Sequence, residues 1–180
     1  MVSEALSTPT IVTLGEAKMH FRILDNAEDT QIEMVVSAAT EKAAQITNRV
    51  LGATDFKLYV GDFVQDVELD KSPFNSISKI EYKSSNGNIR ELTGYTTIKN
   101  MARGTAIVKM VKPDDFESDL TIFYNAGYSP TPAQIKMFIL AEALTMFENR
   151  HFSDVEGALN SNTKTYYTHL LDSYRLIPIR

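Results

Sequence analysis

The sequence contains no cysteine, only three histidines and no long apolar run. The absence of cysteine excludes disulfide bonds, thiolate metal sites and cysteine catalysis. The longest unbroken apolar run extends from Met137 to Ala141, far short of the roughly 20 residues of a membrane-spanning helix, so we expect no membrane span. The first residues lack the basic segment and apolar core of a secretion signal, and we expect no such signal.

The histidines and glycines form none of the common catalytic motifs. His20, His151 and His169 lie far apart in the sequence, and none has a second ligand at metal-binding spacing. The chain also lacks the G-x-S-x-G motif of serine hydrolases and the glycine-rich loops that bind phosphate. We therefore expect a protein that is not an enzyme and that needs no metal or cofactor.

The overall charge is acidic. The chain of 180 residues has a hydrophobic content of 43% and a net charge of -5, which fits one globular domain with its own core. Tight DNA binding needs a surplus of lysine and arginine on some face, because affinity comes from phosphate contacts. The lysines and arginines here are scattered among acids, which argues against a protein that grips DNA.

The N-terminal part predicts a flexible lead-in followed by two helices, the helical segment covering residues 12–52. Residues 1–11 are small and polar, which favours disorder. Thr13 and Glu16 have the spacing of a capping box, which predicts a short helix over residues 14–21. A second helix is predicted to stop before Gly52, and its other side is polar enough to line a channel or contact a partner. Its apolar residues keep one face: Ile32, Val35, Val36, Ala39, Ala43, Ile46 and Val50.

Residues 55–125 change from a helical to an alternating pattern, which predicts a β-rich insertion of five to six short antiparallel strands. Asn86-Gly87 is a strong hairpin signal and predicts that residues 77–83 pair with residues 89–98. Pro73 marks a loop, because proline cannot donate a hydrogen bond inside a sheet. Helices before and after these strands predict an α+β fold, with the remaining strands at residues 56–60, 63–69, 104–111 and 120–124.

The C-terminal part, residues 132–175, is again helical. Pro132 suits the first helical position and Thr131 the N-cap of a long helix over residues 133–150. This helix is apolar around more than half of its circumference, which is typical of a helix covered on two sides. Only a narrow polar stripe remains, formed by Gln134, Glu142, Thr145 and Asn149.

The chain ends in a short helix and an apolar tail. After a loop at residues 151–162, Tyr167, Leu170, Leu171 and Tyr174 have helical spacing. Pro178 then disfavours a helical Ile177, so residues 176–180 are expected to be extended. This C-terminal run either folds back onto its own domain or docks on another chain. It comprises Tyr174, Arg175, Leu176, Ile177, Pro178, Ile179 and Arg180.

The residues alone leave open two function classes besides a structural protein: a metal-dependent nuclease and a binding module. Glu81 and Lys83 lie on one strand face, with Asp66 and Asp70 upstream, in a pattern that resembles the acid-x-lysine strand of metal-dependent nucleases. The simpler interpretation is a solvated strand face beside a hairpin, where charge pairs across strands are common. Residues 114–119 could hold Ca²⁺ but lack the glycine and the distal glutamate of an EF-hand loop. The binding module would be β-rich and would have a concave, aromatic-lined pocket.

The order of these segments resembles a known family: the head-tail connector, or head-completion adaptor, proteins of long-tailed phages, in the longer form with a β-rich insertion between the helices. The resemblance covers about residues 12–180 and rests on their order. The matching segments are Val12-Thr13-Leu14-Gly15-Glu16-Ala17-Lys18, residues 32–49, Pro73-Phe74, Asn86-Gly87, Phe123-Tyr124-Asn125-Ala126-Gly127-Tyr128, Pro132-Ala133-Gln134-Ile135-Lys136, Glu148-Asn149-Arg150 and Tyr174-Arg175.

The resemblance implies a structural virion protein. Such proteins form a ring, usually of twelve copies, below the portal vertex and join the head to the tail or to a second neck ring, while DNA passes through the lumen. They are often monomeric until they assemble on the portal. The resemblance further implies that the C-terminal run 174–180 contacts the portal protein, and it makes the polar stripe of residues 134–149 a candidate subunit contact. Gly15 departs from the family, where a good helix former is common at this position.

Overall fold

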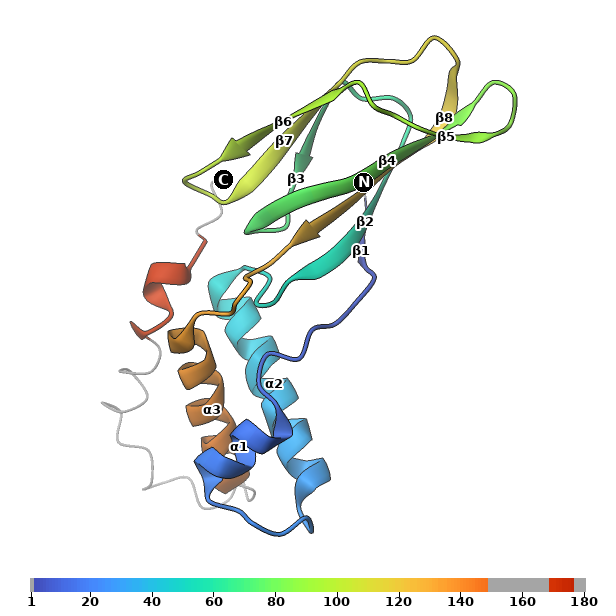
Figure 1. The fold of residues 1–180 in the computed structure, drawn as a ribbon. Coiled ribbons are helices and arrows are strands. Elements are labelled where there is room, and N and C mark those ends of the chain that lie inside the picture. Colours follow the sequence, from blue (N-terminus) through green and yellow to red (C-terminus); the bar gives the residue numbers. More distant parts are fainter. Residues whose placement is uncertain (1, 149–168, 177–180) are drawn as a thin grey trace. The chain divides into compact units, whose positions relative to one another are not determined.

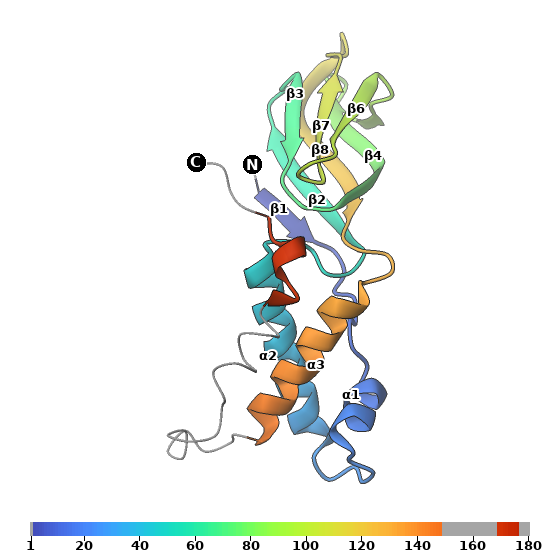
Figure 2. The same cartoon turned by 90° about the vertical axis from the view of Figure 1, so that its left-hand side faces the viewer.

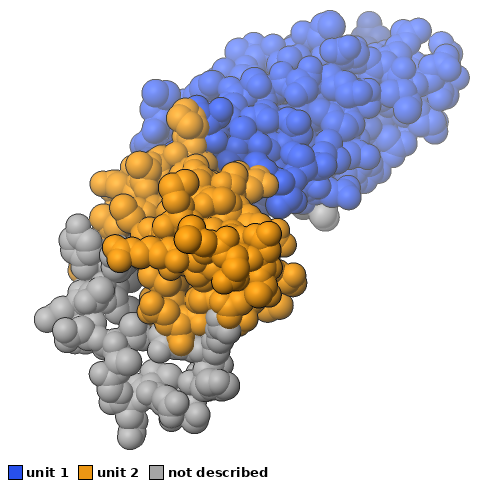
Figure 3. Space-filling model, turned by 60° about the horizontal axis from the view of Figure 1, so that its bottom comes forward, with its two compact units in different colours: residues 1–9, 52–129 blue, residues 10–51, 130–180 orange. Residues whose placement is uncertain are grey.

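The computed structural model describes residues 2–148 and 169–176, which form an α+β protein (Figure 1). The chain divides into two compact units, coloured separately in Figure 3. Unit 1 contains residues 1–9 and 52–129, and unit 2 contains residues 10–51 and 130–180. The described residues hold eight strands, all in unit 1, and three α-helices, all in unit 2. The α+β class is confirmed, although the strands outnumber the five or six expected.

Unit 1 consists of two antiparallel sheets, and the smaller sheet lies over one face of the larger one in both views (Figure 1, Figure 2). The larger sheet has the order β1-β2-β8-β4-β5, and its strands are β1 (Val2–Ala5), β2 (Thr54–Gly61), β8 (Phe116–Ala126), β4 (Phe74–Ser84) and β5 (Ile89–Glu91). The smaller sheet has the order β3-β7-β6, with β3 (Asp66–Leu69), β7 (Thr105–Met110) and β6 (Tyr95–Asn100).

Strand β8 supplies the centre of the unit 1 core. Its alternate residues Leu120, Ile122 and Tyr124 are completely buried, as the period-2 pattern of a half-covered strand requires. The ring of Tyr124 stacks on Phe56 of β2 with 5.5 Å between ring centres. Burial raises the pKa of the Tyr124 hydroxyl to about 12, so this residue enters the core in its neutral form.

The Asn86-Gly87 hairpin is confirmed. Strands β4 and β5 pair from Glu81–Glu91 to Lys83–Ile89, and Gly87 takes the positive φ of 80° that this turn favours. The expected single strand over residues 89–98 is wrong, because β5 ends at Glu91 and the chain passes to the other sheet before β6 begins. Just after β5, the Leu92 side chain is buried and its N–H still donates to the carbonyl of Ile80 on β4.

Residues 2–5, which the sequence places in a flexible lead-in, form the edge strand β1. This strand pairs with β2 over four residues, from Val2–Tyr59 to Ala5–Phe56. Its sequence, VSEA, lacks the β-branched and aromatic run by which a strand is usually detected.

Unit 2 packs the helices α1 (Leu14–Phe21), α2 (Asp29–Thr47) and α3 (Ala133–Glu148), followed by the short 3₁₀ helix η2 (Asp172–Tyr174). The predicted helix over residues 14–21 is confirmed at both ends. The ring of Phe21 on α1 lies 5.4 Å from that of Phe147 on α3. Leu171, from the predicted C-terminal helix, is completely buried, whereas Tyr167 and the loop at residues 151–162 lie outside the described residues. None of the described helices is long and apolar enough to cross a membrane.

Helix α2 ends earlier than Gly52. Asn48 adopts the left-handed conformation, with φ 52° and ψ 38°, and its N–H binds the carbonyl of Ala44. Asparagine tolerates this conformation better than most residues, so it ends the helix four residues before the glycine that was expected to do so. The predicted stripe is confirmed in part. The buried residues of α2 are Ile32, Val36, Ala39, Ala43 and Thr47, whereas Val35, Ile46 and Val50 of the predicted stripe are only half-buried.

Candidate functional site

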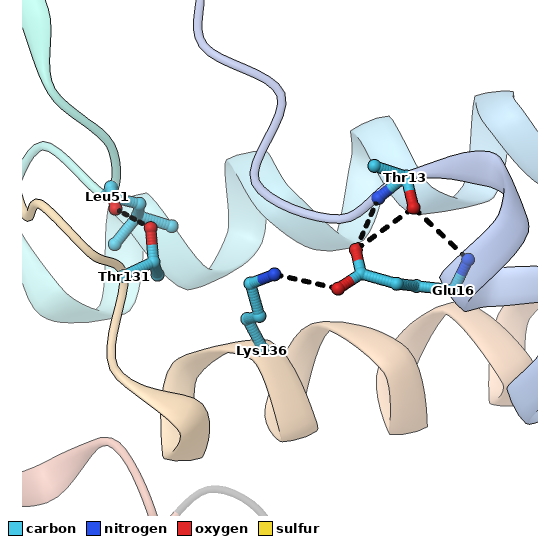
Figure 4. Close-up of polar contacts among 5 residues, drawn as sticks. All are labelled: Thr13, Glu16, Leu51, Thr131 and Lys136. Carbon is cyan, nitrogen blue, oxygen red and sulfur yellow. Dashed lines mark hydrogen bonds and ion pairs between the residues drawn. The ribbon is translucent and has the colours of Figure 1, made fainter.

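Helix α1 is joined to helix α3 by a three-residue contact within unit 2 (Figure 4). The Glu16 backbone N–H donates to the Thr13 hydroxyl at 3.2 Å, and the Thr13 N–H donates to the Glu16 carboxylate at 2.8 Å, so the predicted capping box is confirmed. The other carboxylate oxygen of Glu16 accepts from Lys136 Nζ of α3 at 2.8 Å. The hydrogen bond from Lys136, with that from Thr13, lowers the pKa of Glu16 to about 2.

A second contact fixes the start of α3 beside the end of α2 (Figure 4). The Thr131 hydroxyl donates to the carbonyl of Leu51 at 2.7 Å. The predicted N-cap at Thr131 is wrong, because the Pro132 carbonyl accepts the first helical hydrogen bonds, from Ile135 and Lys136, and therefore occupies the cap position. The Thr131 side chain therefore binds the segment after α2 and does not cap α3.

The polar stripe of α3 divides into residues with different surroundings. Gln134 is exposed. The Glu142 carboxylate pairs with Lys42 of α2 at 2.5 Å and is largely buried, and the Thr145 hydroxyl donates to the Ala141 carbonyl at 2.9 Å. Asn149 lies outside the described residues. Among the three described members of the stripe, only Gln134 is exposed, as expected.

The described part of the C-terminal run is bound to the end of α2. The N–H of Leu176 donates to the carbonyl of Thr47 at 2.8 Å, and the Arg49 guanidinium Nε donates to the carbonyl of Tyr174 at 2.7 Å. Arg175 is already extended, with φ -71° and ψ 123°. Residues 174–176 therefore pack on unit 2, and the last four residues of the run, Ile177, Pro178, Ile179 and Arg180, lie outside the described residues.

The exposed side of α2 has acidic and neutral side chains. The single lysine or arginine of the helix is Lys42, which is paired with Glu142. A surface of this kind offers no cation to a phosphate group. Its exposed polar residues are Thr30, Glu33, Ser37, Glu41 and Gln45, followed by the C-cap Asn48.

Glu81 and Lys83 of the nuclease hypothesis line one shallow pocket, but Asp66 and Asp70 are not among its lining residues. Glu81 lies on β4 of the larger sheet and binds Lys79 at 2.6 Å, and Lys83 pairs with Glu117 at 3.6 Å. Asp66 lies on β3 of the smaller sheet. Within residues 2–148 and 169–176, no group of three or more histidine, aspartate or glutamate side chains is placed to hold a metal ion.

In the acidic segment 114–119, Asp115 binds three side chains of the β4–β5 hairpin, and we call this contact the Asp115 clamp. The Asp115 carboxylate accepts hydrogen bonds from the Ser84 hydroxyl at 2.7 Å, the Tyr82 hydroxyl at 2.8 Å and the Arg90 guanidinium at 2.8 Å. The bonds from Ser84 and Tyr82 lower the pKa of Asp115, while the same carboxylate raises the pKa of Tyr82. Sequence spacing could not identify this contact, because its partners are 25 to 33 residues away.

Comparisons with known proteins find the same fold in phage-like particles. No protein-family model and no curated protein sequence matches the chain. A chain of the structure "Neck of empty GTA particle computed with C6 symmetry" is similar, with a TM-score of 0.76 and 17% identity, over 100% of this chain and 98% of that chain. Chains from "Virion of native gene transfer agent (GTA) particle" and "Neck of native GTA particle computed with C12 symmetry" match at TM-scores of 0.75 and 0.70, each with 16% identity and the same coverage.

Proposed function

We propose that this chain is a structural protein of a virion neck, a connector that forms a ring below the portal and joins the head to the tail. The observation that carries the proposal is the fold likeness, with a TM-score of 0.76 over 100% of this chain and 98% of a neck chain. Such coverage requires counterparts for both units. It therefore does not rest on a sheet pair or a helix pair that many unrelated proteins share.

The proposed assembly is a ring of twelve copies, formed on the portal from single chains. Two of the similar chains come from necks whose symmetry is given as C6 and C12, which supports a ring. The partners would be the portal protein on one side and the next neck or tail-completion protein on the other. The protein would reside in the virion neck, and in the host cytoplasm during assembly.

DNA would pass through the lumen without sequence-specific binding. A net charge of -5 supports this, because a negative wall repels phosphate groups. The exposed side of α2 adds local support, since its glutamates Glu33 and Glu41 are not accompanied by an available cation on that helix. These features would let a duplex slide through the ring.

The C-terminal run would provide the portal contact. Tyr174 and Leu176 use backbone groups within unit 2, so residues 177–180 are the part of the run that can be removed without breaking these bonds. Apolar residues with an extended backbone can add to a partner's sheet edge or fill a groove. Removing residues 177–180 should therefore leave unit 2 folded and abolish binding to the portal.

The decisive experiment is electron microscopy of portal rings incubated with the purified protein. A ring of added density with twelve subunits is expected, and portal rings that remain bare would refute the neck assignment. The chain lacking residues 177–180 tests the tail separately. Unchanged binding of that variant, with a normal unfolding curve, would refute the portal-docking role of the tail and leave the ring proposal intact.

A further inference from the structure

Strand β1 is separated along the chain from the unit in which it folds. Residues 1–9 belong to unit 1, the chain then builds residues 10–51 of unit 2, and unit 1 resumes only at Gly52. The covalent connection between β1 and its partner β2 therefore runs through α1 and α2. Because β1 is an edge strand with a long connection to β2, it can leave its own sheet and pair with β2 of another copy while the other strands stay paired.

The strand is held mainly by its backbone. Among its described side chains, Glu4 and Ala5 are exposed and Ser3 is half-buried, so β1 adds none of them to the core. The Ser3 hydroxyl lies 3.3 Å from Asp70 and 3.5 Å from the Tyr124 hydroxyl, both long for bonds between oxygens. Release of residues 3–5 would therefore remove none of their side chains from the core.

The segment after β1 has the properties of a hinge. Leu6 and Ser7 still contact Asp55, through the bond from the Leu6 N–H to the Asp55 carbonyl at 2.8 Å and that from the Asp55 N–H to the Ser7 hydroxyl at 3.3 Å. Residues 8–10 then form no turn or strand and are exposed or half-buried. Ile11 and Val12 are buried again, at 8% and 4% exposure, and anchor the base of the segment in unit 2.

The edge of β2 can be paired by β1 of the same chain or by β1 of another copy. Without β1, its backbone N–H and carbonyl groups would form an open edge of the kind that pairs with other chains. A β1 strand from an adjacent copy would restore the same hydrogen bonds. The form in which β1 pairs within its own chain and the form in which it pairs with a neighbour therefore differ mainly in the conformation of the hinge and in the need for a nearby copy. A ring supplies that proximity, because each copy has a neighbour at fixed distance.

We propose that β1 is an exchangeable arm, which in the assembled ring pairs with β2 of the adjacent copy. This inference rests on the proposed neck function, since it needs a ring. Every copy donates one strand and receives one, so a closed ring leaves no β2 edge unpaired. The exchange would link the subunits by strand pairing in addition to surface contacts.

The absence of cysteine in the natural chain makes a direct test possible. Glu4 and Lys57 are opposite each other in the β1–β2 register, and opposed residues have Cβ atoms about 4.5–5.5 Å apart, close enough for a disulfide after small adjustments. Glu4→Cys is introduced into one preparation and Lys57→Cys into another. The two are mixed, assembled on portal rings and mildly oxidised, so that a disulfide between the two sites can form only between copies.

The expected result is a covalent dimer that contains the residue 4 to residue 57 crosslink, identified by mass spectrometry of its peptides. Glu4→Cys mixed with Glu81→Cys is the matched control, because Glu81 lies on β4, which β8 separates from β2. The double variant Glu4→Cys/Lys57→Cys, oxidised as the free chain, should close within one chain and so verify the register and the fold.

The outcomes separate the two proposals. Rings that assemble but give no more of this crosslink between copies than the control pair would overturn the exchange and leave the neck function standing. Portal rings that gain no density would overturn the neck function, and the exchange with it. A double variant that fails to close within one chain would overturn the β1–β2 register on which the exchange depends.

Discussion

The carboxylate of Glu16 on α1 accepts a hydrogen bond from Lys136 on α3 at 2.8 Å, across 120 residues of sequence. The same carboxylate completes the capping box with Thr13. One side chain therefore both starts a helix and joins it to the longest apolar helix of unit 2. The two functions can be separated by mutation.

Thr13→Ala is expected to destabilise the protein more than Glu16→Gln. The alanine removes the hydroxyl that caps α1, which costs about 1 kcal/mol. Glutamine can still reach back to the N-cap amide. It loses the negative charge in the first turn and the ion pair with Lys136, a pair that contributes roughly 0.2–1 kcal/mol because both side chains are partly exposed to solvent. Urea unfolding of the two variants and the natural protein measures the difference. A larger loss for Glu16→Gln would show that the contact between helices matters more than the cap.

The stabilising contribution of Glu16 should depend on pH. Its pKa in the folded protein, about 2, lies below the ordinary value of 4.5, so folding favours the charged form. The contribution is therefore complete above about pH 4.5 and is lost as the pH falls from 4.5 toward 2. The measurement is the difference in unfolding free energy between the natural protein and Glu16→Gln, which should shrink over this range. A difference that stays constant down to pH 2 would contradict the assignment.

Asp115→Asn is expected to loosen the β4–β5 hairpin. The substitution weakens the bonds from Tyr82, Ser84 and Arg90, which together hold the hairpin to the turn before β8. Backbone amide hydrogen exchange of residues 84–91 should become faster while that of central β8 stays slow. Asp114→Asn serves as control, because the neighbouring side chain makes none of these three bonds. Equal effects of the two substitutions would rule out a specific clamp.

The features that sequence alone predicted are those set by near neighbours in the chain. The capping box of Thr13 and Glu16 spans three residues, and the hairpin turn at Asn86-Gly87 depends on the backbone freedom of one glycine, so both are encoded locally. The amphipathic face of α2 can also be predicted from sequence, because its apolar residues recur at helical spacing along the helix.

The features that sequence missed depend on contacts between distant residues. Strand β1 has no apolar alternation and exists because the edge of β2 pairs with it. The end of β5 at Glu91 has no local signal in the sequence, and Asp115 binds side chains from β4 and β5. In each case tertiary structure decides what local propensity leaves open.

The α3 stripe leads to a prediction about subunit contact. Since the Glu142 carboxylate is paired with Lys42 within the chain, Gln134 is the described member of the stripe best placed to meet a neighbouring subunit. Gln134→Trp should therefore block ring formation through steric bulk and leave the unfolding free energy of the single chain nearly unchanged, as is usual for surface substitutions.

Glu142→Gln is the matched comparison. It should lower the stability of the single chain, because it weakens the partly buried ion pair with Lys42, and should leave ring formation intact. Urea unfolding of the free chains and electron microscopy of portal rings measure the two effects separately. If Glu142→Gln blocked the ring while Gln134→Trp assembled normally, the subunit contact would have to lie at the Glu142 part of the stripe, and the ion pair within the chain would have to open on assembly.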